Sequence, residues 1–214
     1  MKTLNKFIFL FSLGLLNACS DSAMRDDLYP WQVKPVANGN SQVFGIELGK
    51  ANFSQAQGIM GRRYDAAVFE NKDGSLSLEL FYKEITLGGL TAKFVLTLGA
   101  NAEELQRLKG RPLKKETMES GVIKYTVAKN DSDELMAMDI TAITYMPITD
   151  LEEDVIRNRF GEPAEKIRTH ESAQHWLYPE KGLDLIINAE GKEILQFVPP
   201  REFGKLVKPL KVRG

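Results

Sequence analysis

Short segments in which apolar and polar residues alternate constrain this chain more than any other feature of its sequence. They lie at residues 75–80, 93–98, 122–127, 139–145, 174–178, 183–187 and 193–198. A period of two is typical of strands with one buried face. Turn-forming sequences precede or separate several of them, namely Asn71-Lys72-Asp73-Gly74, Pro179-Glu180-Lys181-Gly182 and Asn188-Ala189-Glu190-Gly191. Strands joined by tight turns are antiparallel, so the sequence predicts an antiparallel sheet.

Three other segments have the sequence signature of short helices. Each begins with a capping side chain that is followed three residues later by Glu or Gln, and each closes on glycine. The segments are Asn52-x-x-Gln55 to Gly61, Asn101-x-x-Glu104 to Gly110, and Thr149-x-x-Glu152 to Gly161. Because three helices are too few to alternate with the strands, the predicted class is α+β, with the helices packed on one face of the sheet.

The two halves of the chain share a pattern that predicts a tandem duplication. Residues recur at a constant offset of 100: Leu48, Ala56, Met60 and Gly61 match Ile148, Ile156, Phe160 and Gly161. A chance alignment of two amphipathic helices is the alternative. We expect a signal peptide at 1–18, a lipidated tether at 19–40, α+β units at 41–112 and 113–200, and a basic tail at 201–214.

The first eighteen residues predict export. Lys2 and Lys6 flank the start of an apolar run from Phe7 to Leu16, which is shorter than the roughly 20 residues that cross a bilayer. An uncleaved membrane anchor is the alternative. The sequence Leu16-Asn17-Ala18-Cys19 resembles the lipobox of bacterial lipoproteins, although Asn17 stands where a small residue is usual. The resemblance implies cleavage before Cys19, the only cysteine of the chain, and permanent attachment through its acyl chains.

The residues after Cys19 bear on where the anchored chain would reside. By resemblance to sorting in enteric bacteria, Ser20 implies the outer membrane rather than the inner one, because Asp21 stands one place too late for retention. We therefore expect the mature chain at the periplasmic face of the outer membrane, bound through its lipid anchor. A net charge of −1 and a sequence pI near 6.2 provide no cationic field, so nucleic acid is not an expected partner.

The second half of the chain resembles a known family. Ile148 to Val155, Phe160-Gly161-Glu162-Pro163 and His175-Trp176-Leu177-Tyr178 are similar to the small SmpA/OmlA-type lipoproteins of the outer-membrane β-barrel assembly machinery. The match spans about fifty residues, and Phe160 stands where leucine is usual. With a second copy in the first half, the whole is similar to the tandem arrangement of β-lactamase-inhibitor-like proteins. Both families act by contact rather than by chemistry, which implies an envelope protein as partner.

Motifs for catalysis or metal binding are not recognisable in the sequence. His170 and His175 are five residues apart, whereas the zinc-protease helix needs a spacing of four for both to face one ion. The oxygen-rich segment 130–134 lacks the glycine and the distant glutamate of a calcium loop, and a solvated turn is expected there. No serine lies in a nucleophile elbow. We expect no catalysis, no cofactor and no metal.

Aromatic residues are the candidate protein contacts, because tyrosine and tryptophan are enriched in interface hot spots. The candidates are Tyr29, Trp31, Trp176 and Tyr178. Trp176 and Tyr178 share one face of a strand, and a place in the core is the favoured alternative for both. Trp31, in the predicted tether, is the strongest single candidate.

The C-terminal tail concentrates positive charge. Its cations Arg201, Lys205, Lys208, Lys211 and Arg213 alternate with apolar residues and form a candidate site for an anionic surface. A frayed solubilising tail is the favoured alternative.

Three functions remain open from the sequence. The first is a non-catalytic lipoprotein that binds a protein or assists envelope assembly. The second is an inhibitor that inserts the loop at 71–74 or 179–182 into a periplasmic or foreign hydrolase. The third is an enzyme of unrecognised type.

Overall fold

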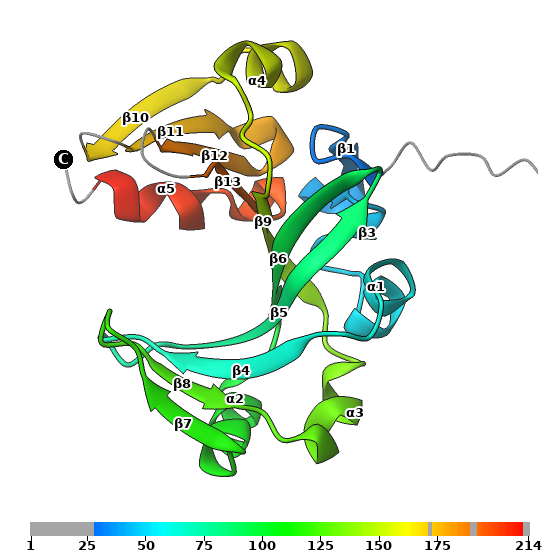
Figure 1. The fold of residues 1–214 in the computed structure, drawn as a ribbon, viewed down its shortest axis with the longest axis vertical. Coiled ribbons are helices and arrows are strands. Elements are labelled where there is room, and N and C mark those ends of the chain that lie inside the picture. The colour runs from blue at the N-terminus through cyan, green and yellow to red at the C-terminus, as the bar shows by residue number, and fades with distance from the viewer. Residues whose placement is uncertain (1–27, 171–172, 189–191, 212–214) are drawn as a thin grey trace, which may run out of the picture.

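The computed structural model describes residues 28–170, 173–188 and 192–211. Its helices are α1 (Phe53–Met60), α2 (Ala102–Gly110), α3 (Ser132–Leu135), α4 (Glu153–Phe160) and α5 (Gly204–Lys211). Its strands are β1 (Lys34–Val36), β2 (Asn40–Val43), β3 (Ile46–Glu47), β4 (Asp65–Glu70), β5 (Leu76–Leu87), β6 (Leu90–Leu98), β7 (Lys114–Thr117), β8 (Ile123–Thr126), β9 (Ile140–Pro147), β10 (Glu165–His170), β11 (Ala173–Tyr178), β12 (Leu183–Asn188) and β13 (Ile194–Phe197). The predicted α+β class is confirmed (Figure 1).

Ten of the strands form one antiparallel sheet, in the order β10-β11-β12-β13-β9-β6-β5-β4-β8-β7. The two halves of the chain therefore share a single sheet. They meet where β9 pairs with β13 on one side and with β6 on the other. Strands β1, β2 and β3 form a separate small sheet.

The large sheet contains the same succession of elements twice. A helix precedes four neighbouring strands, first as α1, β4, β5, β6 and β9, then as α4, β10, β11, β12 and β13. The fourth strands of the two sets meet at the middle of the sheet. Residues 99–139, which include α2, β7, β8 and α3, are inserted into the first set. Strands β7 and β8, which the sequence placed in a unit starting at residue 113, thus extend the sheet beyond β4. The repeat supports the predicted duplication.

The helix that starts each set ends on a glycine with the same backbone conformation. Gly61 has φ 81° and ψ −174°, and Gly161 has φ 82° and ψ −172°. Only glycine adopts this region readily. The amide of each glycine donates to the carbonyl four residues earlier, at 2.8 Å and 2.9 Å. The predicted stops of these two helices are confirmed, whereas Gly110 lies within α2 and Arg111 follows as its cap.

The predicted capping residues are confirmed for α1 and α2. The side chains of Asn52 and Asn101 each accept the amide proton three residues later at 3.0 Å. In return, Gln55 and Glu104 accept the amide protons of the two asparagines. Both helices therefore start with a complete capping box.

The prediction that Thr149 caps the third helix was wrong. Helix α4 starts after Glu152, which is extended and makes no side-chain capping bond. The start of α4 is set by a contact with the residue that precedes β13. The buried Glu193 carboxylate accepts the amide proton of Leu151 at 2.9 Å and so holds this segment beside the start of β13.

The main core fills one face of the sheet, beneath α1, α2, α4 and the small sheet. Phe44, in the turn between β2 and β3, contributes the central contact although its φ is 53°, an uncommon value for a residue with a side chain. Its ring lies 5.1 Å from that of Phe94, 5.3 Å from Tyr145 and 6.0 Å from Phe197. These rings belong to β6, β9 and β13, so Phe44 fastens the small sheet over the place where the two halves meet.

The C-terminal residues form a helix on the opposite face of the sheet, which corrects the expectation of a frayed tail. Phe203, Leu206, Val207 and Leu210 pack on a second apolar cluster. That cluster contains Ala142, Ile167 and Leu177, one residue from each of β9, β10 and β11. Because side chains alternate along a strand, Leu177 faces away from its core neighbours Trp176 and Tyr178. Helix α5 therefore covers a face that the other helices leave free.

The expectation of a tether up to residue 40 was wrong for the residues that the structure describes. From residue 28 onward the chain packs on the globule and then forms β1 and β2. The rings of Tyr29 and Trp31 are stacked at 4.9 Å, and Trp31 meets Phe160 of α4 edge-on at 6.3 Å. Residues 1–18 and Cys19 lie outside the described residues.

The two outer strands of the large sheet are rich in charge. β7 carries Lys114, Lys115 and Glu116, and β10 carries Glu165, Lys166 and Arg168. Charged side chains on edge strands oppose pairing with a further strand.

Candidate functional site

The face of the sheet that carries α5 is uncovered over β4, β5, β6 and β8, and we call this area the open face. Its residues are Ala67 and Phe69 of β4, Glu79 and Phe81 of β5, Val95 of β6 and Lys124 of β8. Cross-strand pairs place them together, because Ala67 lies opposite Glu79, Phe81 opposite Val95, and Phe69 opposite Lys124. Residues paired in this way project from the same face.

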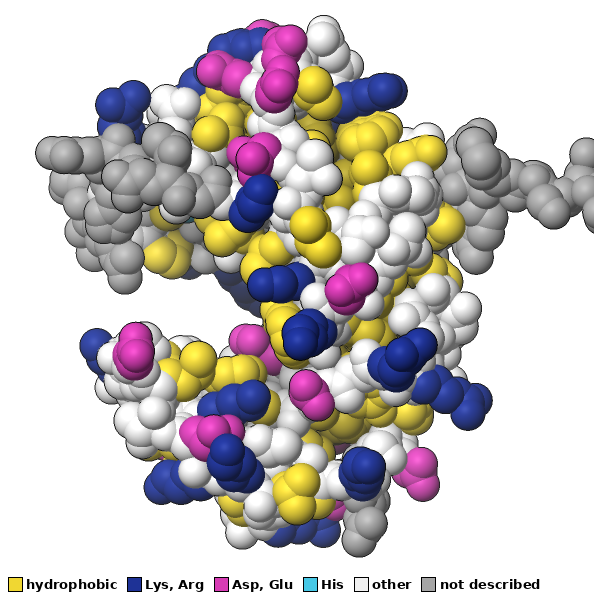
Figure 2. Space-filling view, in the orientation of Figure 1, with side chains coloured by type: hydrophobic (Ala, Val, Ile, Leu, Met, Phe, Trp, Pro, Cys, Tyr) yellow, Lys and Arg dark blue, Asp and Glu magenta, His cyan; other side chains and the backbone are white. Residues whose placement is uncertain are grey.

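The open face lines a hollow in the molecule. In Figure 1, α5 lies above β4 and β8, and β5 and β6 run beside the gap between them. The space-filling view in Figure 2 shows the indentation with hydrophobic side chains along it. A small pocket of about 100 Å³, lined by the open-face residues and Asp65, lies on this surface.

The apolar side chains of the open face are accessible. Phe81 is 36% exposed, and Phe69 and Val95 are half-buried. Accessible apolar side chains that cluster on the solvent side of a sheet are candidates for an interaction surface.

Glu79 stands among these apolar side chains. Burial raises the pKa of its carboxyl, and a hydrogen bond that the Ser77 hydroxyl donates at 2.9 Å opposes this shift. Within the described residues, no lysine, arginine or histidine forms an ion pair with Glu79. The open face thus combines an apolar surface with one poorly solvated acid.

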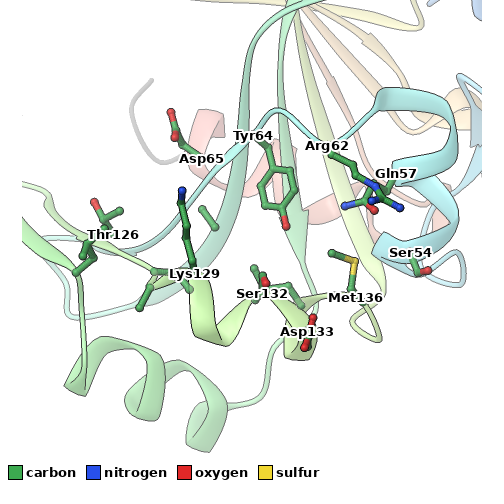
Figure 3. A pocket seen from close by; sticks show the side chains of 15 residues that line it. Ser54, Gln57, Arg62, Tyr64, Asp65, Thr126, Lys129, Ser132, Asp133 and Met136 are labelled. Atoms are coloured by element: carbon green, nitrogen blue, oxygen red, sulfur yellow. The ribbon is translucent and has the colours of Figure 1, made fainter.

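A second, larger cavity of about 650 Å³ lies between α1, α3 and the facing ends of β4 and β8 (Figure 3). In Figure 3 the Tyr64 hydroxyl points toward α3, where Ser132 and Asp133 lie. Arg62 and Lys129 bring positive charge to its lining, and Asp65 and Asp133 bring negative charge. The opposite charges are equal in number, so the lining does not favour a ligand of either sign.

The chemistry of this larger cavity is limited by its groups. Tyr64 is its only aromatic hydroxyl, and burial, assisted by the negative charge of Asp133, raises the pKa of that phenol. The phenol therefore stays protonated at neutral pH and does not serve as a general base. The lining contains no histidine or cysteine that would activate a nucleophile. The cavity can hold a polar group by hydrogen bonds.

Two of the predicted contact residues are core residues. Trp176 is fully buried and Tyr178 is 5% exposed. The favoured alternative, a place in the core, is therefore confirmed for both residues. The ammonium of Lys166 lies 3.7 Å from the centre of a Trp176 ring, and the Arg157 guanidinium lies 4.7 Å from it. These cations cover the indole, so Trp176 does not reach a partner directly.

Tyr29 and Trp31 are half-buried and occupied by contacts within the chain. The Arg159 guanidinium lies 4.9 Å from the Trp31 ring centre, and the Tyr29 ring lies against Gly88, where a Cβ would approach it to 3.0 Å. Their position on α4 and beside β5 corrects the expectation that Trp31 extends from a tether as a free contact residue.

The predicted cationic tail is divided by the fold. Arg201 donates to the Asn38 carbonyl at 3.1 Å and packs against Gly39 and Gly49, so it fastens the N-terminal segment. Lys205 pairs with Glu202, and Lys211 lies 4.0 Å from Glu165. Lys208 is exposed on α5, and Arg213 lies outside the described residues. Of the four described members of the predicted set, three lie within 4.0 Å of a glutamate carboxylate, which partly neutralises the expected cationic surface.

The segments that were considered for metal binding, 130–134 and the two histidines, lie partly within the described residues. The turn expected at residues 130–134 is helical, and two of its three acids are paired: Asp131 with Arg111 at 2.7 Å, and Glu134 with Arg107 at 2.5 Å. His175 bonds through Nδ1 to the buried Asp184 carboxylate at 2.8 Å. The side chain of His170 lies outside the described residues.

In the part of the chain that the structure describes, no group of three or more His, Cys, Asp or Glu side chains is placed to hold a metal ion. Among the described helices, none combines the length and the apolar character that a membrane span requires.

Comparisons with known proteins give no relative. No protein-family model matches the chain, and no curated protein or solved structure matches it. The resemblance to the SmpA/OmlA-type lipoproteins stays a prediction that rests on the residues quoted for it.

Sequence reasoning missed the open face although its signal is present. In the strand segment Ser77-Leu78-Glu79-Leu80-Phe81, the residues at even positions are fully buried. Phe81 therefore shares a face with Ser77 and Glu79, the polar side of the strand. An aromatic residue out of phase with the buried positions is the signal that points to a contact surface.

Proposed function

We propose that this protein is a lipid-anchored binding module that presents its open face to a protein partner in the cell envelope. The observation that carries the proposal is the accessible cluster of Phe69, Phe81 and Val95 on the part of the sheet face that α5, among the described helices, leaves uncovered. Apolar and aromatic side chains in a concave surface provide the buried centre of a protein interface.

The placement of the N-terminal segment is compatible with this role. Cys19, the proposed site of lipidation, precedes the first described residue, Leu28, by nine residues. Tyr29 and Trp31 pack on α4 and near Gly88, and the neighbouring β1 lies away from the hollow in Figure 1. An anchor attached there leaves the open face accessible to a partner. As a proposal from the sequence, the membrane is the outer one and the protein lies on its periplasmic face.

The anchor and the open face are tested separately. Replacing Cys19 with serine removes the thiol that accepts lipid, so the protein should move from the membrane pellet to the soluble fraction of lysed cells. Mass spectrometry of the natural protein should find an acylated N-terminal cysteine. A Cys19→Ser protein that still sediments with membranes contradicts lipid anchoring.

The open face is tested by crosslinking in intact cells. A photoreactive amino acid at position 81 should yield a protein adduct, whereas the same group at Lys34, an exposed position of β1, should not. Adducts with a component of envelope assembly support the proposed role, and an adduct with a soluble hydrolase favours the inhibitor. If position 81 gives no adduct, the open face is not the interface.

A further inference from the structure

The open face contains a pocket with a distinct chemistry. The side chains of Phe69, Phe81 and Val95 supply apolar surface, and Ala67 is almost fully buried directly opposite Glu79. The pocket volume is about 100 Å³, which suits a single side chain rather than a large ligand. Such a pocket holds one group of a partner while the surrounding surface contacts the rest.

Glu79 differs from the other partly buried glutamates of the described chain. Glu70 accepts hydrogen bonds from Lys109 at 2.6 Å and from Tyr125 at 2.7 Å, and these lower its pKa. Glu47 is held in the same way by Asn40 and Lys50, with a lowered pKa. Glu79 has only the Ser77 hydroxyl, and its pKa is shifted in the opposite direction by burial.

The lining of the pocket contains more negative than positive charge. Glu79 and Asp65 contribute two carboxylates to the lining, and Lys124 contributes one ammonium. The lining thus has a net charge of −1. An ionised acid in such surroundings is stabilised by a cation that brings its own hydrogen-bond donors.

We infer that this pocket receives a lysine or arginine side chain of the protein partner. The aliphatic part of that side chain lies between Phe69 and Phe81, and its charged end donates hydrogen bonds to the Glu79 carboxylate. Long basic side chains suit this arrangement because their stems are apolar and their ends are charged. The aromatic rings add a favourable interaction with the cation. The inference rests on the proposed function, since it names the group that the open face recognises.

The experiment uses the adduct formed from position 81 and a pair of matched variants. The crosslinked peptide of the partner is identified by mass spectrometry, and the purified partner is then titrated against the natural protein, Glu79→Gln and Glu84→Gln. Glu84 lies on the same strand and is exposed, so it controls for the loss of one negative charge.

The expected result is a crosslinked peptide that contains lysine or arginine. The affinity should fall about 10-fold or more for Glu79→Gln, because the partner's cation is left without its acceptor, and less than about 2-fold for Glu84→Gln. Replacing the basic residue of the partner with norleucine or methionine should reproduce the loss and add nothing to that of Glu79→Gln.

The outcomes separate the inference from the proposed function. If position 81 captures a partner but Glu79→Gln binds it as tightly as the natural protein does, the basic side chain is not recognised there and the inference fails, while the proposed function stands. If the crosslinked peptide lacks a basic residue, the inference fails in the same way. If position 81 captures no protein, both fail.

Discussion

The hydroxyl of Tyr178 donates a hydrogen bond to the carbonyl of Gly161 at 3.0 Å. Burial raises the pKa of Tyr178 to about 12, so the hydroxyl keeps its proton at neutral pH. The first half of the chain has the same bond, from Tyr82 to the Gly61 carbonyl at 3.1 Å. In each half, a strand tyrosine thus fixes the glycine that ends the preceding helix. The pair is a stronger sign of repetition than the apolar residues at an offset of 100.

Removing either tyrosine hydroxyl should destabilise the protein. Tyr178→Phe and Tyr82→Phe each leave a glycine carbonyl without its donor, and each should lower the free energy of unfolding by about 1 kcal/mol. Urea denaturation followed by tryptophan fluorescence measures the change. An unchanged midpoint in both variants contradicts a structural role for these bonds.

The glycine that ends α4 should not tolerate alanine. A Cβ at Gly161 meets no atom within 4 Å, so the cost of Gly161→Ala comes from its positive φ alone, about 1–3 kcal/mol. Gly58 provides the matched control, because a Cβ there also meets nothing and Gly58 lies inside α1. Gly58→Ala should stabilise the protein by about 0.5–1 kcal/mol. Thermal or urea unfolding should give shifts of opposite sign.

The helix caps predict a contrast between two similar substitutions. Asn101→Ala removes the side chain that accepts the Glu104 amide proton, and should cost about 1 kcal/mol of stability. Thr149→Ala should leave stability unchanged, because Thr149 does not cap α4. Equal losses in the two variants, measured by urea unfolding, are incompatible with the observed start of α4.

Glu79 should make stability depend on pH. Burial raises its pKa in the folded state, so the folded protein binds the proton more tightly than the unfolded chain does. Stability is therefore lost as the pH rises from the usual glutamate range through the raised pKa. Glu79→Gln should be more stable than the natural protein at pH 7, and the difference should disappear below the usual glutamate pKa. The exposed control Glu84→Gln should show no such difference in a series of urea unfolding curves at several pH values.

Substitutions of His175 and Asp184 should have coupled effects on the free energy of unfolding. Burial raises the pKa of Asp184, and one of its oxygens, Oδ1, has no hydrogen-bond partner. His175→Leu removes the partner of the other oxygen and should cost about 2–3 kcal/mol, because a buried acceptor then lacks any donor. The double variant with Asp184→Leu should recover much of this loss. If the losses of unfolding free energy in the two single variants add up to the loss in the double variant, the two residues are not coupled.

The sequence predicted the elements that follow a regular period, and missed those whose residues serve tertiary contacts. Seven strands were expected where β5, β6, β8, β9, β11, β12 and β13 lie. Strand β4 was missed because Ala66, Ala67 and Val68 do not alternate with polar residues. Strand β10 was missed because Lys166, rather than an apolar residue, covers Trp176. A strand without alternation and a contact with a distant residue leave no mark in local periodicity.

The site was less predictable than the fold. The aromatic candidates were chosen by residue type, but type does not tell a core tryptophan from an exposed one. Helix α5 was missed because short helices depend on tertiary packing, and the apolar residues Leu206, Val207 and Leu210 find their partners on strands that are distant in sequence. The out-of-phase Phe81 marks one residue of the open face in the sequence, but its neighbours Phe69 and Val95 are known only from the pairing of β4, β5 and β6.

The charged outer strands have a consequence for the association of copies of this chain. An exposed strand allows a sheet to grow from one copy to the next. The charged side chains of both edges would have to lose water for that to happen, namely Lys114, Lys115 and Glu116 on β7 and Glu165, Lys166 and Arg168 on β10. The two ends of the sheet therefore discourage polymerisation, which leaves the hollow, rather than an edge, to the proposed partner.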